Sequence, residues 1–224
     1  MKILAASDFH GFKSTLEAFA QKAETTKAEI IVLCGDITNF GTEKQAKILL
    51  SPLTKLKKPV LFVPGNCDPP SLVDMNFGNI KCIHGSTFIY EDSVFLGVGG
   101  SPRTPFNTFF EMDESEIFEV LCKAVGNLGS GMNKRKIIVV SHAPPKDTKV
   151  DKTYFGEHVG SIGVRKFIEE YEPVLVLCGH IHEAKGVDKI GDTLIINLGA
   201  ARHGNYVAIN IAEEKINANF NVLR

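Results

Sequence analysis

Apolar runs of strand length, alternating with segments of helical periodicity, constrain the fold of this chain most. The early runs are almost continuous in Val, Ile and Leu, as in Glu29–Cys34 (EIIVLC) and Pro59–Pro64 (PVLFVP). Such runs are typical of strands that are covered on both faces. Apolar residues recur at helical spacing in the segments 13–26, 42–56, 113–125 and 161–171. The alternation of strand and helix predicts βαβ units around a mainly parallel sheet.

From about residue 173 the helical periodicity ends and short strands follow one another directly. We expect these strands to form an antiparallel meander, within a mixed α/β protein in which strands outnumber helices. A chain of 224 residues, 44% of them hydrophobic, is long enough for one well-buried core. One domain spanning residues 1–224 is therefore the expected organisation.

Charge and cysteine content narrow the function classes. The chain has 25 basic and 26 acidic residues, without the basic surplus of proteins that bind nucleic acid or anionic membranes. Its five cysteines include no CxxC pair, which suits a reducing compartment rather than a disulfide framework. No apolar run approaches the roughly 20 residues of a membrane span, and the N-terminal run is too short for a signal peptide. We expect a cytoplasmic protein without membrane association.

Residues with metal-binding side chains follow five of the predicted strands, directly where each strand ends. They are Asp8 and His10, Asp36, Asn66, His142, and finally His180 and His182. Ligands of open α/β sheets bind outside the carboxyl ends of the strands. We therefore expect these seven side chains to converge on one crevice.

The seven side chains form a set of oxygen and nitrogen donors. Such a set suits Mn, Fe, Zn, Ni or Co, and it is not a soft sulfur site. Seven ligands exceed the needs of one tetrahedral ion, and a carboxylate with two oxygens can bridge two ions. Taken alone, an aspartate after a strand is usually a helix N-cap. The whole ordered set predicts a dinuclear metal site.

The blocks DFH, GD, GNCD, SH and GHIH, in this order, resemble the motifs of the calcineurin-like metallophosphoesterase superfamily. The resemblance implies a four-layer αββα sandwich, with two mixed β-sheets packed face to face and flanked by helices. It implies that one metal is held by Asp8, His10, Asp36 and His182. It implies that the second metal is held by Asp36 as bridge, Asn66, His142 and His180. Phosphoester hydrolysis by a hydroxide that bridges two ions, most plausibly Mn, is the implied reaction.

The sequence departs from the family pattern after Asn66. Many members have histidine where this chain has Cys67, and a thiol is a poorer mimic of imidazolium. Cys67 and Asp68 are the candidate catalytic residues. Asp68 either orients a metal ligand or Cys67, or it forms an N-cap or Asx-turn before Pro69. The block GDITNFG lacks the arginine of the GDYVDRG block of Ser/Thr protein phosphatases, which argues against that activity.

Two basic residues are candidates for binding the substrate phosphate. Arg103 lies in the long loop 99–110 (GGSPRTPFNTFF), and arginine suits bidentate phosphate binding. An ordinary surface arginine is the competing interpretation. His203, beside Arg202 in GAARHGN, is expected near the rim of the metal site. The phenylalanines of loop 99–110 form either an apolar wall for an organic leaving group or a core or oligomer contact.

Three functions compete. A phosphodiesterase or phosphomonoesterase acting on a small molecule is the favoured hypothesis. A nuclease on the same site is opposed by the near-neutral charge, and a non-catalytic scaffold on the same fold is opposed by the complete ligand set. The sequence leaves the natural substrate and the oligomeric state open.

Overall fold

The computed structural model describes residues 1–128, 135–212 and 215–223. The α-helices are α1 (Lys13–Thr25), α2 (Glu43–Leu50), α3 (Glu114–Gly126) and α4 (Ile162–Tyr171). The first strands are β1 (Lys2–Ala6), β2 (Ile30–Leu33), β3 (Val60–Phe62), β4 (Asn76–Phe77), β5 (Ile80–Cys82), β6 (Thr87–Tyr90), β7 (Ser93–Val98), β8 (Ser101–Pro102) and β9 (Glu111–Met112). The later strands are β10 (Lys136–Ser141), β11 (Leu175–Cys178), β12 (Gly186–Ile190), β13 (Thr193–Asn197), β14 (Asn205–Ala212) and β15 (Lys215–Val222).

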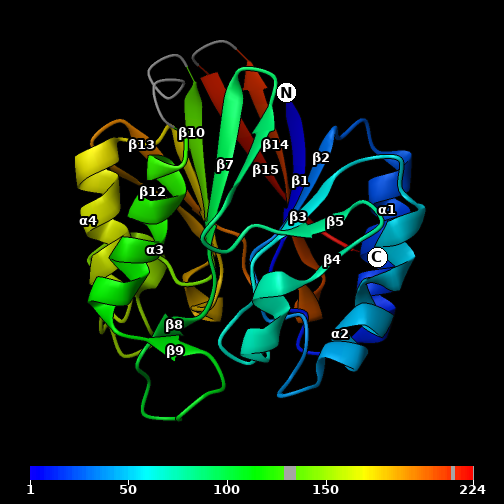
Figure 1. Ribbon diagram of the computed structural model, residues 1–224, viewed down its shortest axis with the longest axis horizontal. Coiled ribbons are helices and arrows are strands. Elements are labelled where there is room, and N and C mark those ends of the chain that lie inside the picture. Colours follow the sequence, from blue (N-terminus) through cyan, green and yellow to red (C-terminus); the bar gives the residue numbers. More distant parts are fainter. Residues whose placement is uncertain (129–134, 213–214, 224) are drawn as a thin grey trace.

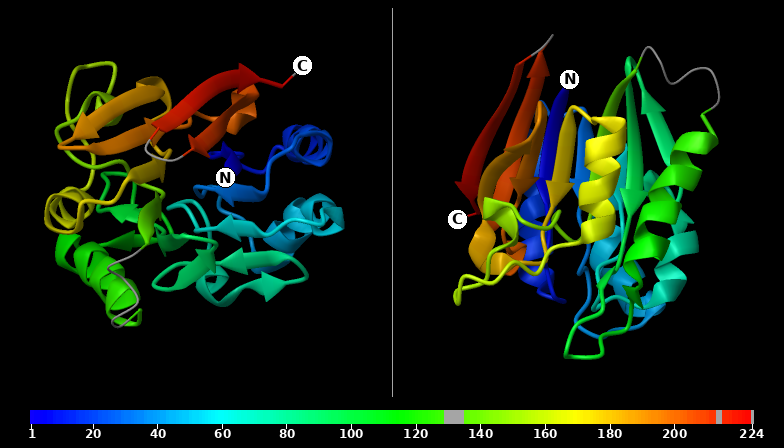
Figure 2. Two further views of the ribbon diagram at one scale, coloured as in Figure 1. Left: turned by 90° about the horizontal axis from the view of Figure 1, so that it is seen from above. Right: turned by 90° about the vertical axis from the view of Figure 1, so that its left-hand side faces the viewer.

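Two large mixed sheets pack face to face, and helices cover both outer faces (Figure 1 and Figure 2). The seven-stranded sheet has the order β15-β14-β1-β2-β3-β5-β4, and the six-stranded sheet the order β12-β13-β11-β10-β7-β6. Helices α1 and α2 lie on the outer side of the first sheet, and α3 and α4 on the outer side of the second (Figure 1). This is the four-layer sandwich that the resemblance of the sequence motifs implies.

The continuous apolar runs are explained by strands that are buried on both faces. In β1, Ile3 and Ala5 contribute to the core between the two sheets, whereas Leu4 and Ala6 contribute to the core beneath α1. Side chains of a strand alternate between its faces, so an inner strand of this sandwich needs apolar residues at every position. A third core layer lies between the six-stranded sheet and the helices α3 and α4.

Helices α2 and α4 begin at capping side chains, whereas α1 begins after Phe12 without one. Thr42 and Gln45 form a reciprocal capping box at the start of α2, and the side chain of Ser161 accepts a hydrogen bond from the Val164 N–H at the start of α4. In the described ranges, no helix combines the length and the apolar character needed to cross a membrane.

The antiparallel meander expected after residue 173 is wrong in part. Strand β13 pairs in parallel with β11 and antiparallel with β12, and β14 joins the other sheet, antiparallel to β1. Ile195 and Ile196 of β13 are fully buried, so β13 occupies an inner position, whereas the partly exposed β12 suits the edge. The sequence also missed the strands β4, β5, β6, β8, β9 and β12, which are short or partly exposed and lack a continuous apolar run.

Candidate metal centre

All seven predicted ligands lie in loops just after the carboxyl ends of strands, and both sheets contribute. The loops of the seven-stranded sheet carry Asp8, His10, Asp36 and Asn66, after β1, β2 and β3. The loops of the six-stranded sheet carry His142, His180 and His182, after β10 and β11. The centre therefore lies where the two sheets meet.

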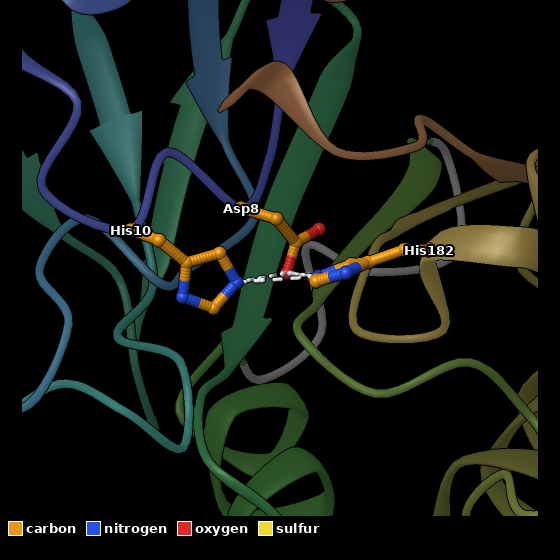
Figure 3. A group of neighbouring side chains, drawn as sticks. All are labelled: Asp8, His10 and His182. Atoms are coloured by element: carbon orange, nitrogen blue, oxygen red, sulfur yellow. Dashed lines mark hydrogen bonds and ion pairs between the residues drawn. The ribbon is translucent and has the colours of Figure 1, made fainter. Parts of the chain in front are cut away.

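Asp8, His10 and His182 form the first cluster (Figure 3). The two imidazole rings point toward each other, with the Asp8 carboxylate between them. His10 Nε2 lies 3.2 Å from His182 Nε2, and His182 Nε2 lies 3.4 Å from Asp8 Oδ1. Metal–ligand bonds of about 2.0–2.2 Å place neighbouring ligand atoms roughly 3.0–3.4 Å apart. The third separation, from His10 Nε2 to Asp8 Oδ1, is wider at 4.0 Å. His182 therefore lies within this range of both other residues, and all three are close enough to share one ion if the Asp8–ion–His10 angle is wide.

Asp36 connects the first cluster to a second one. Its Oδ2 lies 3.5 Å from His10 Nε2 and 3.6 Å from His142 Nε2. On the far side, His142 Nε2 lies 2.9 Å from Asn66 Oδ1. One carboxylate oxygen is thus placed between imidazoles of both clusters, which is the arrangement a bridging ligand requires. The other oxygen, Oδ1, accepts a hydrogen bond from the Cys67 N–H at 2.8 Å.

The second cluster is oriented by hydrogen bonds behind it. His142 Nδ1 lies 2.7 Å from the Cys34 carbonyl oxygen, and an Nδ1–H that donates to this carbonyl leaves the Nε2 lone pair for a metal. The ring of His180 packs against that of His142, with centroids 5.0 Å apart. The His180 N–H donates to Asp8 Oδ2 at 3.1 Å, which ties the two sheets together at the centre.

The backbone is strained at four of the seven residues. Asp8, His10, Asp36 and His180 have φ angles of 60°, 47°, 51° and 66°. Residues other than glycine seldom adopt this left-handed conformation, and such strain, of order 1–3 kcal/mol each, concentrates at functional sites. The strain turns each of these side chains out of its strand direction at the point where the strand ends.

The glycines that precede the ligands permit a close approach. A Cβ atom on Gly65 would collide with the carboxylate of Asp36, and one on Gly179 would collide with Ser7 and the carboxylate of Asp8. The glycines of the Gly-Asn and Gly-His motifs are therefore required because other loops of the centre pass directly against their α-carbons.

Asp68 joins two of the ligand loops. Its Oδ1 accepts from the Thr38 N–H at 2.7 Å and from Thr38 Oγ1 at 2.8 Å. Its Oδ2 accepts from the N–H groups of Ile37 at 3.0 Å and Gly65 at 2.9 Å. Four hydrogen bonds use the acceptor positions of this fully buried carboxylate. Asp68 thereby fixes the loop of Asn66 against the loop of Asp36.

Burial and neighbouring charges shift the pKa values of the candidate ligands in different directions. Burial raises the pKa of Asp36, and the nearby carboxylates of Asp8 and Asp68 raise it further. Burial also acts to raise the pKa of Asp8, but the hydrogen bond with His182 and the neighbouring imidazoles outweigh it, so that this pKa is lowered. Burial lowers the pKa of His10 to about 4 and that of His180 to about 3. These shifts favour neutral imidazole, the form that binds metals, at His10 and His180. At His142 burial acts to lower the pKa, but the carboxylates of Asp36 and Asp8 outweigh it and raise this pKa.

Cys67 is buried beside this cluster. Its Sγ lies 3.8 Å from Asn66 Nδ2 and belongs, with His10 and Asp36, to a group of potential ligand atoms within 4.8 Å of one another. Burial, together with the Asp36 charge, raises the pKa of the Cys67 thiol far above its ordinary value. The raised pKa favours the protonated thiol next to the candidate ligands His10 and Asp36.

The two basic residues selected from the sequence occupy different surroundings. Arg103 Nε lies 2.6 Å from Asp113 Oδ1, on an exposed surface. His203 Nε2 accepts a hydrogen bond from Arg202 Nε at 3.3 Å, and Arg202 Nη2 lies 3.3 Å from His182 Nδ1. Arg202 thus contacts the metal cluster directly, and sequence reasoning did not select it. The available signal was an arginine, the preferred binder of phosphate oxygens, adjacent to the selected histidine.

Asn197 is a second residue that sequence reasoning missed. Its Nδ2 donates to the carbonyl oxygens of Val150 at 3.0 Å, Gly179 at 3.3 Å and Ile181 at 2.9 Å. This fully buried amide fixes the loop that carries His180 and His182. The signal was an amide at the end of an otherwise apolar strand, because a buried polar group needs partners.

Comparisons with known proteins agree with this geometry. A family model described as calcineurin-like phosphoesterase matches residues 1–184. The uncharacterized protein MJ1162 of Methanocaldococcus jannaschii is 38% identical over 202 residues, covering 88% of this chain and 87% of that protein. A probable glycerophosphodiester phosphodiesterase, GpdQ, of Arcobacter nitrofigilis is 23% identical over 84% of this chain and 68% of its own length. Among solved structures, a dimetal phosphatase from Danio rerio superposes with a TM-score of 0.73 at 12% identity, covering 100% of this chain and 96% of the other.

Proposed function

The chain belongs to the calcineurin-like phosphoesterase family and is a metal-dependent phosphoric ester hydrolase, and we propose that it uses two divalent ions to hydrolyse small-molecule phosphodiesters or phosphomonoesters. The position of Asp36 Oδ2, between His10 Nε2 at 3.5 Å and His142 Nε2 at 3.6 Å, carries the proposal. The similarity to a probable glycerophosphodiester phosphodiesterase and to the fold of a dimetal phosphatase supports it.

The proposed ligand sets follow the two clusters. Asp8, His10 and His182 would hold one ion and Asn66, His142 and His180 the other, with Asp36 shared. Two bound ions would supply a water nucleophile of lowered pKa and positive charge next to the phosphoryl oxygens. The oxygen and nitrogen donors suit Mn first, and also Fe, Zn, Ni or Co. Asn66 would contribute a neutral oxygen, which leaves more net positive charge at its ion than a second carboxylate would.

Arg202 is the side chain that we assign to the substrate phosphate. Its guanidinium contacts His182 and His203, whereas the ion pairs among described residues couple Arg103 to Asp113 and Arg165 to Glu169. A guanidinium beside a metal ligand, with its charge not committed to a carboxylate there, suits an incoming phosphate oxygen. His203, which accepts from Arg202 Nε, would keep that side chain in position.

A metal-reconstitution assay tests the proposal. Protein stripped with a chelator is loaded with Mn, its metal content is determined by elemental analysis, and aryl and alkyl phosphodiesters and monoesters are offered. We expect about two ions per chain and metal-dependent release of alcohol or phenol. Single-stranded DNA and RNA are offered in parallel, and a strong preference for either would make the enzyme a nuclease. Binding of two ions without hydrolysis of any ester would support a scaffold instead.

A further inference from the structure

Exposed aromatic side chains occur in the loops that follow β1, β2 and β10 and in the loop between β8 and β9, and these loops lie on the same side of the molecule (Figure 1). Six described phenylalanine and tyrosine side chains in these loops are 48–94% exposed: Phe12, Phe40, Phe106, Phe109, Tyr154 and Phe155. Water contact is unfavourable for rings of this size. Their concentration on one side of the molecule requires an explanation beyond packing of the core.

Two of these rings form a pair across separate loops. Phe40 follows β2, and Phe109 lies between β8 and β9. Their ring centroids are 5.1 Å apart and their planes are inclined by 79°, an edge-to-face contact. Phe40 is 48% exposed and Phe109 is 50% exposed. Each ring therefore keeps a large open surface although the pair itself is formed.

Backbone hydrogen bonds attach this pair to the segment that carries Asn66. The Phe40 N–H donates to the Cys67 carbonyl at 3.0 Å, and the Phe110 N–H donates to the Asn66 carbonyl at 3.1 Å. The loops of both rings are thus one hydrogen bond away from the residues of the metal centre. The two loops therefore adjoin the segment that carries the candidate ligand Asn66.

Both loops are held in conformations that present the rings. Phe40 has a φ angle of 54°, which is strained for a bulky side chain. In the loop of Phe109, Glu111 Oε1 accepts hydrogen bonds from Thr104 Oγ1 at 2.6 Å and from Thr108 Oγ1 at 2.6 Å. The Thr108 N–H donates to the same oxygen at 2.8 Å. The two rings are therefore placed in advance, which lowers the entropic cost of binding.

We propose that the Phe40–Phe109 pair is a stacking platform for a planar aromatic group, an aryl ring or a nucleobase, that belongs to the phosphoester substrate. This inference rests on the proposed function and adds the substrate class. A π-face gains a stacking contact on an open ring, and an aliphatic group such as glycerol does not. The platform accordingly selects esters whose organic group is planar and aromatic. It has no part in binding the phosphate group.

Calorimetry with non-hydrolysable probes tests the platform independently of turnover. Phenylphosphonate and cyclohexylphosphonate are titrated into the Mn-loaded protein, because they differ mainly in planarity and π-character. We expect phenylphosphonate to bind roughly threefold to tenfold more tightly, the range of one aromatic contact. Phe40→Leu and Phe109→Leu should each reduce this ratio. Phe220→Leu is the matched control, since Phe220 is also partly exposed but lies on the edge strand β15.

Hydrolysis with a constant leaving group separates the two sources of a planar group. The p-nitrophenyl esters of phenyl phosphate, methyl phosphate and thymidine 5′-phosphate all release p-nitrophenolate, so differences in kcat/KM report the second group. If kcat/KM exceeds that of the methyl ester for the phenyl ester alone, the planar group of the substrate is an aryl ring. If kcat/KM of the thymidine ester exceeds that of the methyl ester, the planar group is a nucleobase. Equal phosphonate affinities in the wild type, with metal content intact, would overturn the platform. Failure to hydrolyse any ester would overturn the proposed function while the binding ratio still judged the platform.

Discussion

The guanidinium of Arg202 rests against the imidazole of His182, with Nη2 of the arginine 3.3 Å from Nδ1 of the histidine. The backbone fixes this contact, because the Arg202 N–H donates to the Asp8 carbonyl at 3.1 Å. Nε2 of the same histidine faces Asp8 and His10. One imidazole thus stands between the candidate first metal and a positive charge at the rim.

Replacement of Arg202 tests its assignment to the phosphate. Arg202→Gln should reduce kcat/KM by about tenfold to a hundredfold, the value of a charge-assisted hydrogen bond, with phosphomonoesters affected more than diesters because they carry more charge. Elemental analysis should show that metal content is kept. Arg103→Gln is the comparison, and we expect less than about a twofold change because its partner is Asp113 at the surface. If kcat/KM fell in Arg103→Gln and not in Arg202→Gln, the phosphate would be assigned to Arg103, as the sequence suggested.

Removal of single ligands should separate the two metal sites. Asp36→Asn weakens the bridge and should lower the metal content of both sites, whereas His182→Ala should empty mainly the first. The measurement is the number of metal ions per chain after dialysis against limiting Mn. The visible absorption spectrum of the Co-loaded protein is a second readout. Asp36→Asn protein that retains both ions would contradict the bridging role.

Asp68 should matter for stability as well as for activity. In Asp68→Asn, an amide NH₂ would face backbone N–H donors that now meet a carboxylate oxygen. We expect the free energy of unfolding to fall by about 3 kcal/mol, measured in urea with chelator present. The control is Asp113→Asn, whose side chain is 56% exposed, and it should change stability by less than about 1 kcal/mol. Equal, small effects in both proteins would show that Asp68 has no anchoring role.

Cys67 should influence the choice of leaving group. Without the histidine that many relatives have here, departure of poorly acidic alcohols receives little help, whereas phenolates need little protonation. We expect aryl esters to react faster than alkyl esters that share the same second group, and Cys67→His to narrow the difference. In Cys67→Ala, a loss confined to alkyl esters identifies the thiol as proton donor. A uniform loss indicates a packing role, and unchanged rates remove Cys67 from the mechanism.

His84 predicts a loss of stability in mild acid. Its Nδ1 accepts from the Gly99 N–H at 2.9 Å, and burial lowers its pKa to about 4. Between about pH 6.5 and about pH 4 the unfolded chain binds a proton here that the folded chain does not. The contribution of His84 to the free energy of unfolding is therefore fully present above about pH 6.5. It is lost as the pH falls toward about 4, and the loss amounts to about 2–3 kcal/mol.

The comparison for His84 is His84→Asn, which keeps an acceptor and removes the titration. Urea unfolding of the metal-free proteins at about pH 7.5 and about pH 4.5 gives the pH dependence of each. The variant should lose less stability in acid than the wild type. An identical loss in both proteins would show that other groups carry the whole effect.

The features that the sequence predicted depend on local pattern. The buried parallel strands and the proximity of Asp8 to His182 follow from apolar runs that end in ligand-type residues, which a reader can see within a few positions. The two-sheet sandwich was implied by the family resemblance of the motifs that these residues form. The missed features depend on contacts between distant residues. The contact of Arg202 with His182 joins residues on either side of the paired strands β12 and β13. Three of the four hydrogen bonds of Asp68 reach back to Ile37 and Thr38, about thirty positions earlier. Strand β13 lies inside the sheet, parallel to β11, where its two isoleucines are buried. The spacing of turns in the sequence does not indicate this parallel pairing.

The candidate ligands are divided between the two sheets. Neither sheet alone offers a complete set, since four residues come with one sheet and three with the other. An ion held by residues of both sets would cross-link two sheets whose ligand loops are far apart along the chain. It would bind the docked sheets in preference to the separated ones and so stabilise the folded protein.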